Sequence, residues 1–122
     1  MPERLAGIVP PTTTPFNKDG SVDAKAFRQE VWDLMEAGVR GLAGGGSTGE
    51  GQTLTEEEVW TLVEIAVQEV GGRVPVVAGI IVNSTQQAVA RGRILRSLEV
   101  TTLQITPVHY LFTPNEQEMY DF

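Results

Sequence analysis

The residues best suited to chemistry lie in one glycine-rich stretch, Gly44-Gly45-Gly46-Ser47-Thr48-Gly49-Glu50-Gly51. Glycine adopts positive φ at little cost and lets backbone N–H groups approach a ligand closely, and the hydroxyls of Ser47 and Thr48 add donors at the same point. Because the stretch follows an apolar run and precedes a helix start, we expect these donors to converge on an anion. The sequence therefore predicts an anion-binding loop, with an ordinary polar turn as the alternative.

The elements that must position this loop alternate between short apolar runs and amphipathic segments. Strands are expected over 7–14, 39–44, 74–81 and 102–106, and helices from Asp23 to Gly38, from Thr55 to Gly71, from Ser84 through Leu98, and from Asn115 onward. Thr55 with Glu58, and Ser84 with Gln87, have the spacing of capping boxes. The strand starts recur about every thirty residues, the length of a βα unit, so the pattern predicts an α/β fold with parallel strands.

Composition excludes several classes of protein. The chain has 122 residues, a net charge of -7 and no cysteine. This charge argues against a nucleic-acid partner, which needs clustered Lys and Arg, and the lack of cysteine excludes disulfides and thiolate-bound metals. No apolar run approaches the roughly 20 residues of a membrane span, and the start of the chain lacks the features of a signal peptide. We expect a cytoplasmic protein with no membrane segment and no metal site.

Two phosphate-binding interpretations of the glycine stretch fit poorly. Gly44, Gly46 and Gly49 have the spacing of the dinucleotide fingerprint, which needs its last glycine inside the opening helix and an acidic residue at the end of the next strand. Here the helix is expected to open at Thr55, and the next strand ends in apolar residues. A phosphate P-loop needs a lysine at the position held by Glu50. A dinucleotide-binding domain remains as a weaker alternative.

A set of ordered motifs indicates a different ligand. The motifs are Gly7-Ile8-Val9, Thr14-Pro15-Phe16, Asp19-Gly20-Ser21-Val22-Asp23, Gly46-Ser47-Thr48-Gly49-Glu50, Pro75-Val76-Val77-Ala78-Gly79, and the segment 106–110. Together they resemble the dihydrodipicolinate synthase and N-acetylneuraminate lyase family, whose members are (β/α)8 TIM barrels that form a Schiff base with pyruvate. The resemblance implies that residues 1–122 are a partial TIM-barrel domain, its N-terminal half, with about four βα units and an end within the fourth helix.

The same resemblance implies roles for particular residues. Ser47 corresponds to the hydroxyl that relays a proton, and Ser47, Thr48 and Gly49 would bind the carboxylate of the keto acid. Tyr110 corresponds to a tyrosine that passes a proton and, in family homo-oligomers, reaches into a neighbouring subunit's site. This match is loose, because the family has two tyrosines directly after the proline and this chain has Val108 and His109 there. Either His109 or Tyr110 would then occupy the tyrosine position, and a packing role for Tyr110 is the alternative.

The Schiff-base lysine of the family lies on the sixth strand and has no counterpart here. Lys18 lies in a turn and Lys25 near the start of a helix, whereas barrel enzymes place catalytic groups at the carboxyl ends of strands. A complete barrel takes about 250 residues. The resemblance thus implies the N-terminal portion of a lyase that joins or separates pyruvate and an aldehyde without a cofactor, inactive as an isolated chain. A non-catalytic keto-acid-binding module and a half-barrel that assembles with a second half are the alternatives.

Overall fold

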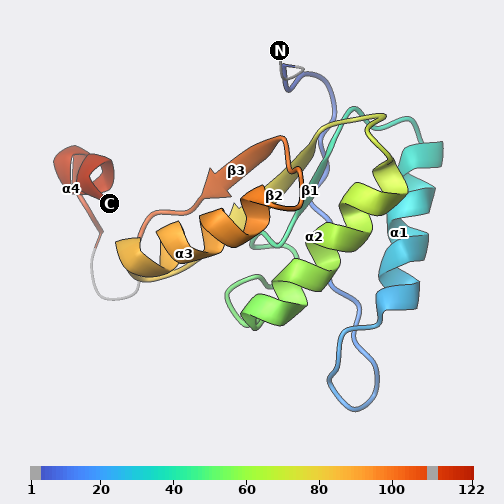
Figure 1. The fold of residues 1–122 in the computed structure, drawn as a ribbon, viewed down its shortest axis with the longest axis horizontal. Coiled ribbons are helices and arrows are strands. Elements are labelled where there is room, and N and C mark those ends of the chain that lie inside the picture. Colours follow the sequence, from blue (N-terminus) through green and yellow to red (C-terminus); the bar gives the residue numbers. More distant parts are fainter. Residues whose placement is uncertain (1–3, 110–112) are drawn as a thin grey trace.

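The computed structural model describes residues 4–109 and 113–122, which form a parallel sheet covered on one side by helices (Figure 1). The sheet has three strands in the order β1 (Leu42–Gly44), β2 (Val76–Ile80) and β3 (Thr102–Ile105). The helices are α1 (Ala24–Glu36), α2 (Glu56–Val70), α3 (Thr85–Arg96) and the short α4 (Glu116–Asp121). Both strand pairs are parallel, so the predicted α/β class with parallel strands is confirmed.

The helices begin and end where capping residues occur. Thr55 accepts a hydrogen bond from the N–H of Glu58, and Glu58 accepts one from the N–H of Thr55, so the predicted capping box is confirmed. Helix α2 is followed by its capping residue Gly71, which has a left-handed φ of 57°. At α3, Ser84 accepts from the N–H of Gln87 but the Gln87 side chain contacts the Ser84 hydroxyl, so only half of the second predicted box forms. In the described ranges, no helix has the length and apolar character needed to cross a membrane.

Segment 7–14 was predicted as a strand, and this prediction is wrong in detail. The segment is extended and runs beside β1, but only one bridge, between Pro11 and Ala43, has the geometry of a ladder. Its backbone hydrogen bonds run from Arg40 N to Ile8 O (2.8 Å), from Ala43 N to Pro10 O (3.0 Å) and from Thr12 N to Ala43 O (2.9 Å). Pro10 and Pro11 have no N–H to donate, so a regular ladder cannot form. The sheet therefore has three strands, with this segment along its edge.

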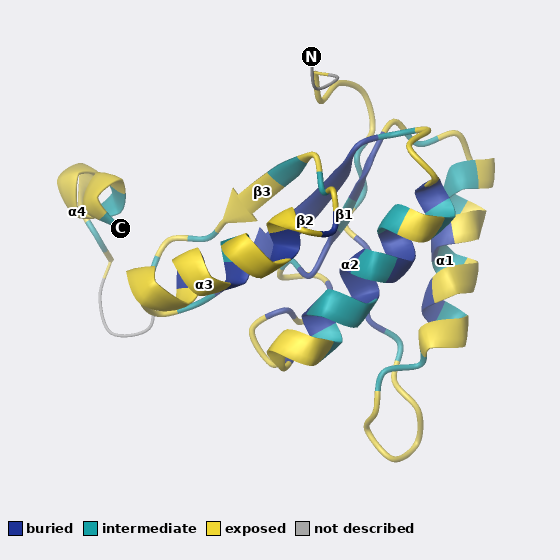
Figure 2. Cartoon of the chain, in the orientation of Figure 1, coloured by how far each residue is buried: buried dark blue, intermediate teal, exposed yellow. Residues whose placement is uncertain are grey.

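The hydrophobic core lies between the sheet and the first three helices. Its largest fully buried side chains include Phe27 and Val31 of α1, Val59, Leu62 and Val63 of α2, Leu42 and Ile80 of the sheet, and Leu95 of α3. Figure 2 shows β2 buried along its whole length, whereas β3 is mostly exposed. Since β2 pairs with a neighbour on both sides and β3 on only one, β3 forms an open edge of the sheet.

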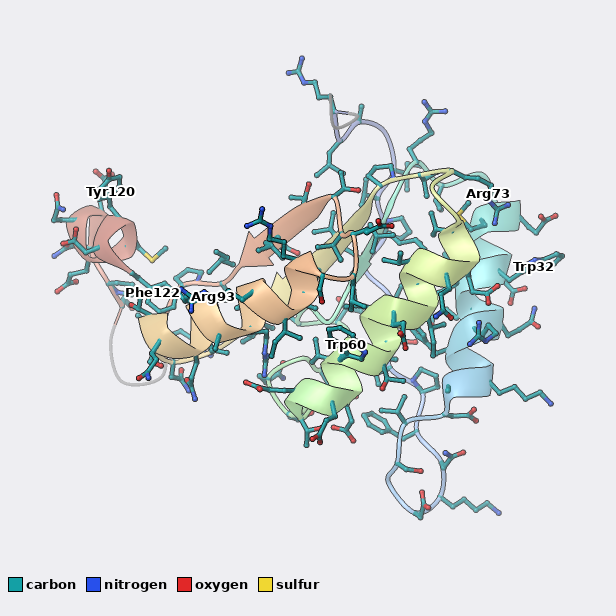
Figure 3. All side chains as sticks on the ribbon, in the orientation of Figure 1. Trp32, Trp60, Arg73, Arg93, Tyr120 and Phe122 are labelled. Atoms are coloured by element: carbon teal, nitrogen blue, oxygen red, sulfur yellow. The ribbon has the colours of Figure 1, made fainter. Side chains whose placement is uncertain are left out.

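The two tryptophans differ in their surroundings. Trp60 is partly buried against the core. Trp32 is 51% exposed and points from α1 away from the sheet (Figure 3). The helical spacing of apolar residues in α1 places Phe27 and Val31 inward, and Trp32 follows Val31 directly, which turns it toward the outside.

Candidate functional site

The candidate site lies at the edge of the sheet where the strands end. In a parallel sheet all carboxyl ends lie at one edge, and barrel enzymes bind their ligands there. The loops that leave this edge span residues 45–55 after β1, 81–84 after β2 and 106–115 after β3. The first of these, named the glycine loop below, contains Ser47, Thr48 and Gly49.

The glycine loop is a series of tight turns. The N–H of Glu50 donates to Ser47 O at 3.1 Å, that of Gly51 to Gly46 O at 3.0 Å, and that of Thr53 to Glu50 O at 2.8 Å. Glu50 itself adopts a positive φ of 56°, and its carboxylate makes no hydrogen bond within the described ranges. Glu50 therefore braces the loop through hydrogen bonds of its backbone.

Two glycines allow this loop to pack directly on the sheet. A Cβ at Gly79 of β2 would lie 2.4 Å from Gly45 O and 2.7 Å from Gly46 N. A Cβ at Gly51 would lie 2.0 Å from the same Gly45 oxygen. Because these contacts are with backbone atoms, which cannot swing aside, only glycine fits at either position. Close packing therefore explains why glycine is needed at these two positions. The sequence analysis expected glycines because they adopt positive φ, and within the loop this reason applies to Gly45.

Two threonines support the loop from segment 7–14, and sequence reasoning gave them no role. The hydroxyl of Thr14, which is 6% exposed, donates to Gly49 O at 2.6 Å. Thr12, 1% exposed, has its hydroxyl 3.4 Å from Ala43 O in β1. The signal that could have identified them is the polar run at the end of an apolar segment, since polar side chains at this edge of a parallel sheet face the site.

Ser47 and Thr48 lie at the exposed tip of the glycine loop. Within residues 4–109 and 113–122, neither their hydroxyls nor their backbone N–H groups donate to a protein acceptor. Gly49 is buried, and a Cβ there would lie 3.1 Å from Thr12 O. The tip thus offers several free donors together, while Gly49 contributes close packing and a carbonyl bound by Thr14.

The loop after β3 is only partly described. Tyr110 falls outside the described residues, so its role stays a prediction. His109 is exposed, and its Nδ1 lies 3.2 Å from Pro107 O, within the loop's own backbone. Within the described ranges His109 contacts no carboxylate that would make it a base.

The lysines occupy exposed positions in a turn and in a helix. Lys18 lies in the turn before α1, and Lys25 lies in the first turn of α1. In the same turn as Lys18, the Ser21 hydroxyl and N–H donate to Asp19 Oδ1 at 2.6 and 3.0 Å, and these hydrogen bonds hold the pKa of Asp19 below its ordinary value. Across the ranges that the structure describes, no three His, Asp or Glu side chains are grouped as metal ligands.

The arrangement excludes the geometry of a dinucleotide site. Gly49 lies in the loop, and α2 begins only at Glu56, so the third glycine of the fingerprint is not in the helix. After β2 come Ile81 and Val82, with no acidic residue to bind a ribose.

Known proteins resemble the chain over nearly its full length. The sequence model of the Dihydrodipicolinate synthetase family matches residues 4–122. A 4-hydroxy-tetrahydrodipicolinate synthase from Methylobacterium radiotolerans is 42% identical over 118 residues, which cover 96% of this chain and 38% of the relative. The chain therefore spans well under half the length of this relative.

Solved structures agree with the sequence comparison. Dihydrodipicolinate synthase from Aquifex aeolicus superposes with a TM-score of 0.88 at 28% identity, over 96% of this chain and 39% of that one. N-acetylneuraminate lyase from Mycoplasma synoviae shares the fold, with a TM-score of 0.83 at 24% identity over 93% of this chain and 39% of that one. The chain belongs to the Dihydrodipicolinate synthetase family.

Proposed function

We propose that this chain supplies the carboxylate-binding part of a lyase that joins or separates pyruvate and an aldehyde. The observation that carries the proposal is the loop tip, where Ser47 and Thr48 present unused hydroxyl and N–H donors on a backbone fixed by Thr14 and Gly79. Preorganised donors of this kind bind a carboxylate without first having to reorganise. Family membership supports the choice of a 2-keto acid as the ligand.

The proposed chemistry follows from this docking. A carboxylate held at Ser47 and Thr48 fixes the neighbouring ketone carbon, and an amine placed beside it condenses with the ketone to an imine and releases water. Fixing the two reacting groups removes much of the entropic cost of bringing them together. In this scheme Ser47 relays a proton, with Tyr110 as the second proton carrier, and a neighbouring copy of the full-length enzyme contributes to the site.

The amine is not expected to come from residues 1–122. Lys18 and Lys25 are exposed, Lys18 in the turn before α1 and Lys25 in the first turn of that helix, and neither lies on β1, β2 or β3. The isolated chain should therefore bind pyruvate without forming an imine. Treatment with pyruvate and borohydride, followed by intact-mass measurement, should leave the mass unchanged, and an adduct at either lysine would overturn the assignment.

Binding itself is tested by titrating the chain with pyruvate and following amide chemical shifts. The largest shifts should occur at Ser47, Thr48 and Gly49. Thr48→Val removes one hydroxyl at nearly constant volume and should weaken binding about five-fold, the worth of one hydrogen bond. Thr53→Val on the same loop is the matched control, because its hydroxyl is already bonded to Glu50 O. Shifts confined to other parts of the chain would refute the proposal.

A half-barrel that assembles with a second half is the other candidate, and the open edge of β3 favours it. Leu103 and Ile105 of this strand are 37% and 53% exposed, and exposed strand edges tend to pair with other chains. Sedimentation should then show a dimer or larger species. A monomer with a cooperative thermal transition would exclude self-assembly and leave the carboxylate-binding proposal intact.

A further inference from the structure

The turn before α1 contains an aspartyl peptide that is open to rearrangement. Asp19 is followed by Gly20, and no other aspartate in the sequence precedes a glycine. Glycine has no side chain to hinder attack by its own nitrogen on the carboxyl group of the residue before it. Gly20 has a φ of 86°, and a Cβ there would meet no atom of the described residues within 4 Å. No neighbour therefore crowds this peptide.

The rearrangement exchanges one backbone bond for another. Gly20 N bonds to Cγ of the protonated Asp19 carboxyl, a C–O bond of that carboxyl breaks, and its hydroxyl leaves with the proton of the N–H as water. The product is a succinimide ring. Water then opens the ring at either carbonyl carbon, which gives back aspartate or gives isoaspartate, in which the chain runs through the side-chain carboxyl. One water leaves and one returns, so no atom is gained or lost overall.

Hydrogen bonds within the turn occupy both reacting groups. The N–H of Gly20 donates to Asn17 O at 3.0 Å. Asp19 Oδ1 accepts from the hydroxyl of Ser21 at 2.6 Å and from its N–H at 3.0 Å. These two donors stabilise the ionised carboxylate and so lower the pKa of Asp19, whereas ring closure needs the protonated carboxyl. The turn must therefore release both groups before the ring can form.

The hydroxyl of Ser21 connects Asp19 to the closure of the turn. Besides donating to Asp19, it accepts from Asn17 Nδ2 at 3.0 Å. The backbone closes around it, because Asn17 N donates to Ser21 O at 2.8 Å and Phe16 forms an antiparallel bridge with Val22. All of these groups belong to the turn itself. Ser21 is thus the side chain that holds the Asp19 carboxylate in place.

We propose that Asp19–Gly20 is a site of isoaspartate formation and that the hydroxyl of Ser21 slows this reaction in the folded chain. The product inserts the Cβ of residue 19 into the backbone. The added atom moves Ser21 O away from Asn17 N, so the modification opens the turn that leads into α1. The reaction does not involve the glycine loop and is independent of the proposed function.

The test is to age the full chain at neutral pH, digest it with chymotrypsin after Phe16 and Phe27, and measure isoaspartate in peptide 17–27 by electron-transfer fragmentation. The isoaspartate fraction at residue 19 should rise with time. Ser21→Ala should accelerate the rise about five-fold, the worth of one net hydrogen bond, whereas Ser21→Thr, which keeps the hydroxyl, should not. Ser97→Ala removes an exposed hydroxyl at the end of α3 and is the matched control, with an unchanged rate.

A measurement in urea separates the effect of the turn from that of the local sequence. When the chain is unfolded, Ser21→Ala and the unaltered chain should isomerise at the same rate, because the turn is gone. Absence of isoaspartate at residue 19 in aged Ser21→Ala would overturn the site. Equal rates for the folded unaltered chain and Ser21→Ala, an equal acceleration in Ser97→Ala, or a difference that persists in urea would overturn the role of Ser21.

Discussion

The hydrogen bond from Thr14 to the glycine loop offers the sharpest test of how this site is held together. The hydroxyl donates to Gly49 O at 2.6 Å, and the bond is buried. Thr14→Val replaces the hydroxyl with a methyl group of similar size, so the carbonyl of Gly49 loses its partner in a place that water does not easily reach. An unsatisfied buried polar group costs about 1–3 kcal/mol. The folding equilibrium should therefore fall by roughly 5- to 150-fold.

Urea unfolding followed by far-UV circular dichroism measures this change. Thr13→Val is the matched control, because it removes the bond from the neighbouring hydroxyl to Glu30 Oε2, which is 2.7 Å long and exposed. Water can replace an exposed hydrogen bond, so the Thr13→Val substitution should lower the free energy of unfolding by less than about 0.5 kcal/mol. Pyruvate binding should weaken in Thr14→Val and not in Thr13→Val, since only the former releases the loop. If the two variants unfold at the same urea concentration, the loop is not held by Thr14.

Two further predictions concern the packing of the loop and the turn before α1. Gly79→Ala forces a Cβ to 2.4 Å from Gly45 O and should destabilise the chain by about 1–3 kcal/mol or more. Gly92→Ala is the control, because the nearest atoms to its Cβ belong to side chains, the first at 3.5 Å, and it should stabilise α3 by about 0.5–1 kcal/mol. Equal effects in thermal unfolding would contradict the close contact. The pKa of Asp19 lies below its ordinary value of 3.8 because Ser21 donates to the carboxylate, so Ser21→Ala should raise it in an NMR titration. The pKa of Asp19 is lower in the folded chain than in the unfolded chain. The hydrogen bonds from Ser21 to the ionised carboxylate therefore stabilise the fold above pH 3.8, and this stabilisation disappears as the pH falls through the folded pKa. An unchanged Asp19 titration in Ser21→Ala would contradict this explanation.

Local sequence signals predicted the helices well. The Thr55–Glu58 box and the glycine after α2 fix both ends of that helix, and these interactions involve residues close in the chain. The first strand was predicted less well, because β-branched residues favour an extended chain but Pro10 and Pro11 prevent the ladder that would make it a strand.

The candidate site was predicted in part. The sequence pointed to Ser47 and Thr48 as donors in a loop after a strand, and the structure describes both as exposed at that loop's tip. The sequence did not point to Thr14, because the hydrogen bond from Thr14 to Gly49 spans 35 residues of sequence.

The sequence by itself determined the order of the elements, the helix boundaries and the composition of the glycine loop, because each depends on residues only a few positions apart. The tertiary structure decided which groups meet: Gly79 beneath Gly45, and Thr14 on Gly49. These contacts join segments that only the pairing of parallel strands brings together, and strand register has no signal in any one segment. That pairing turns a flexible glycine-rich stretch into a fixed set of donors.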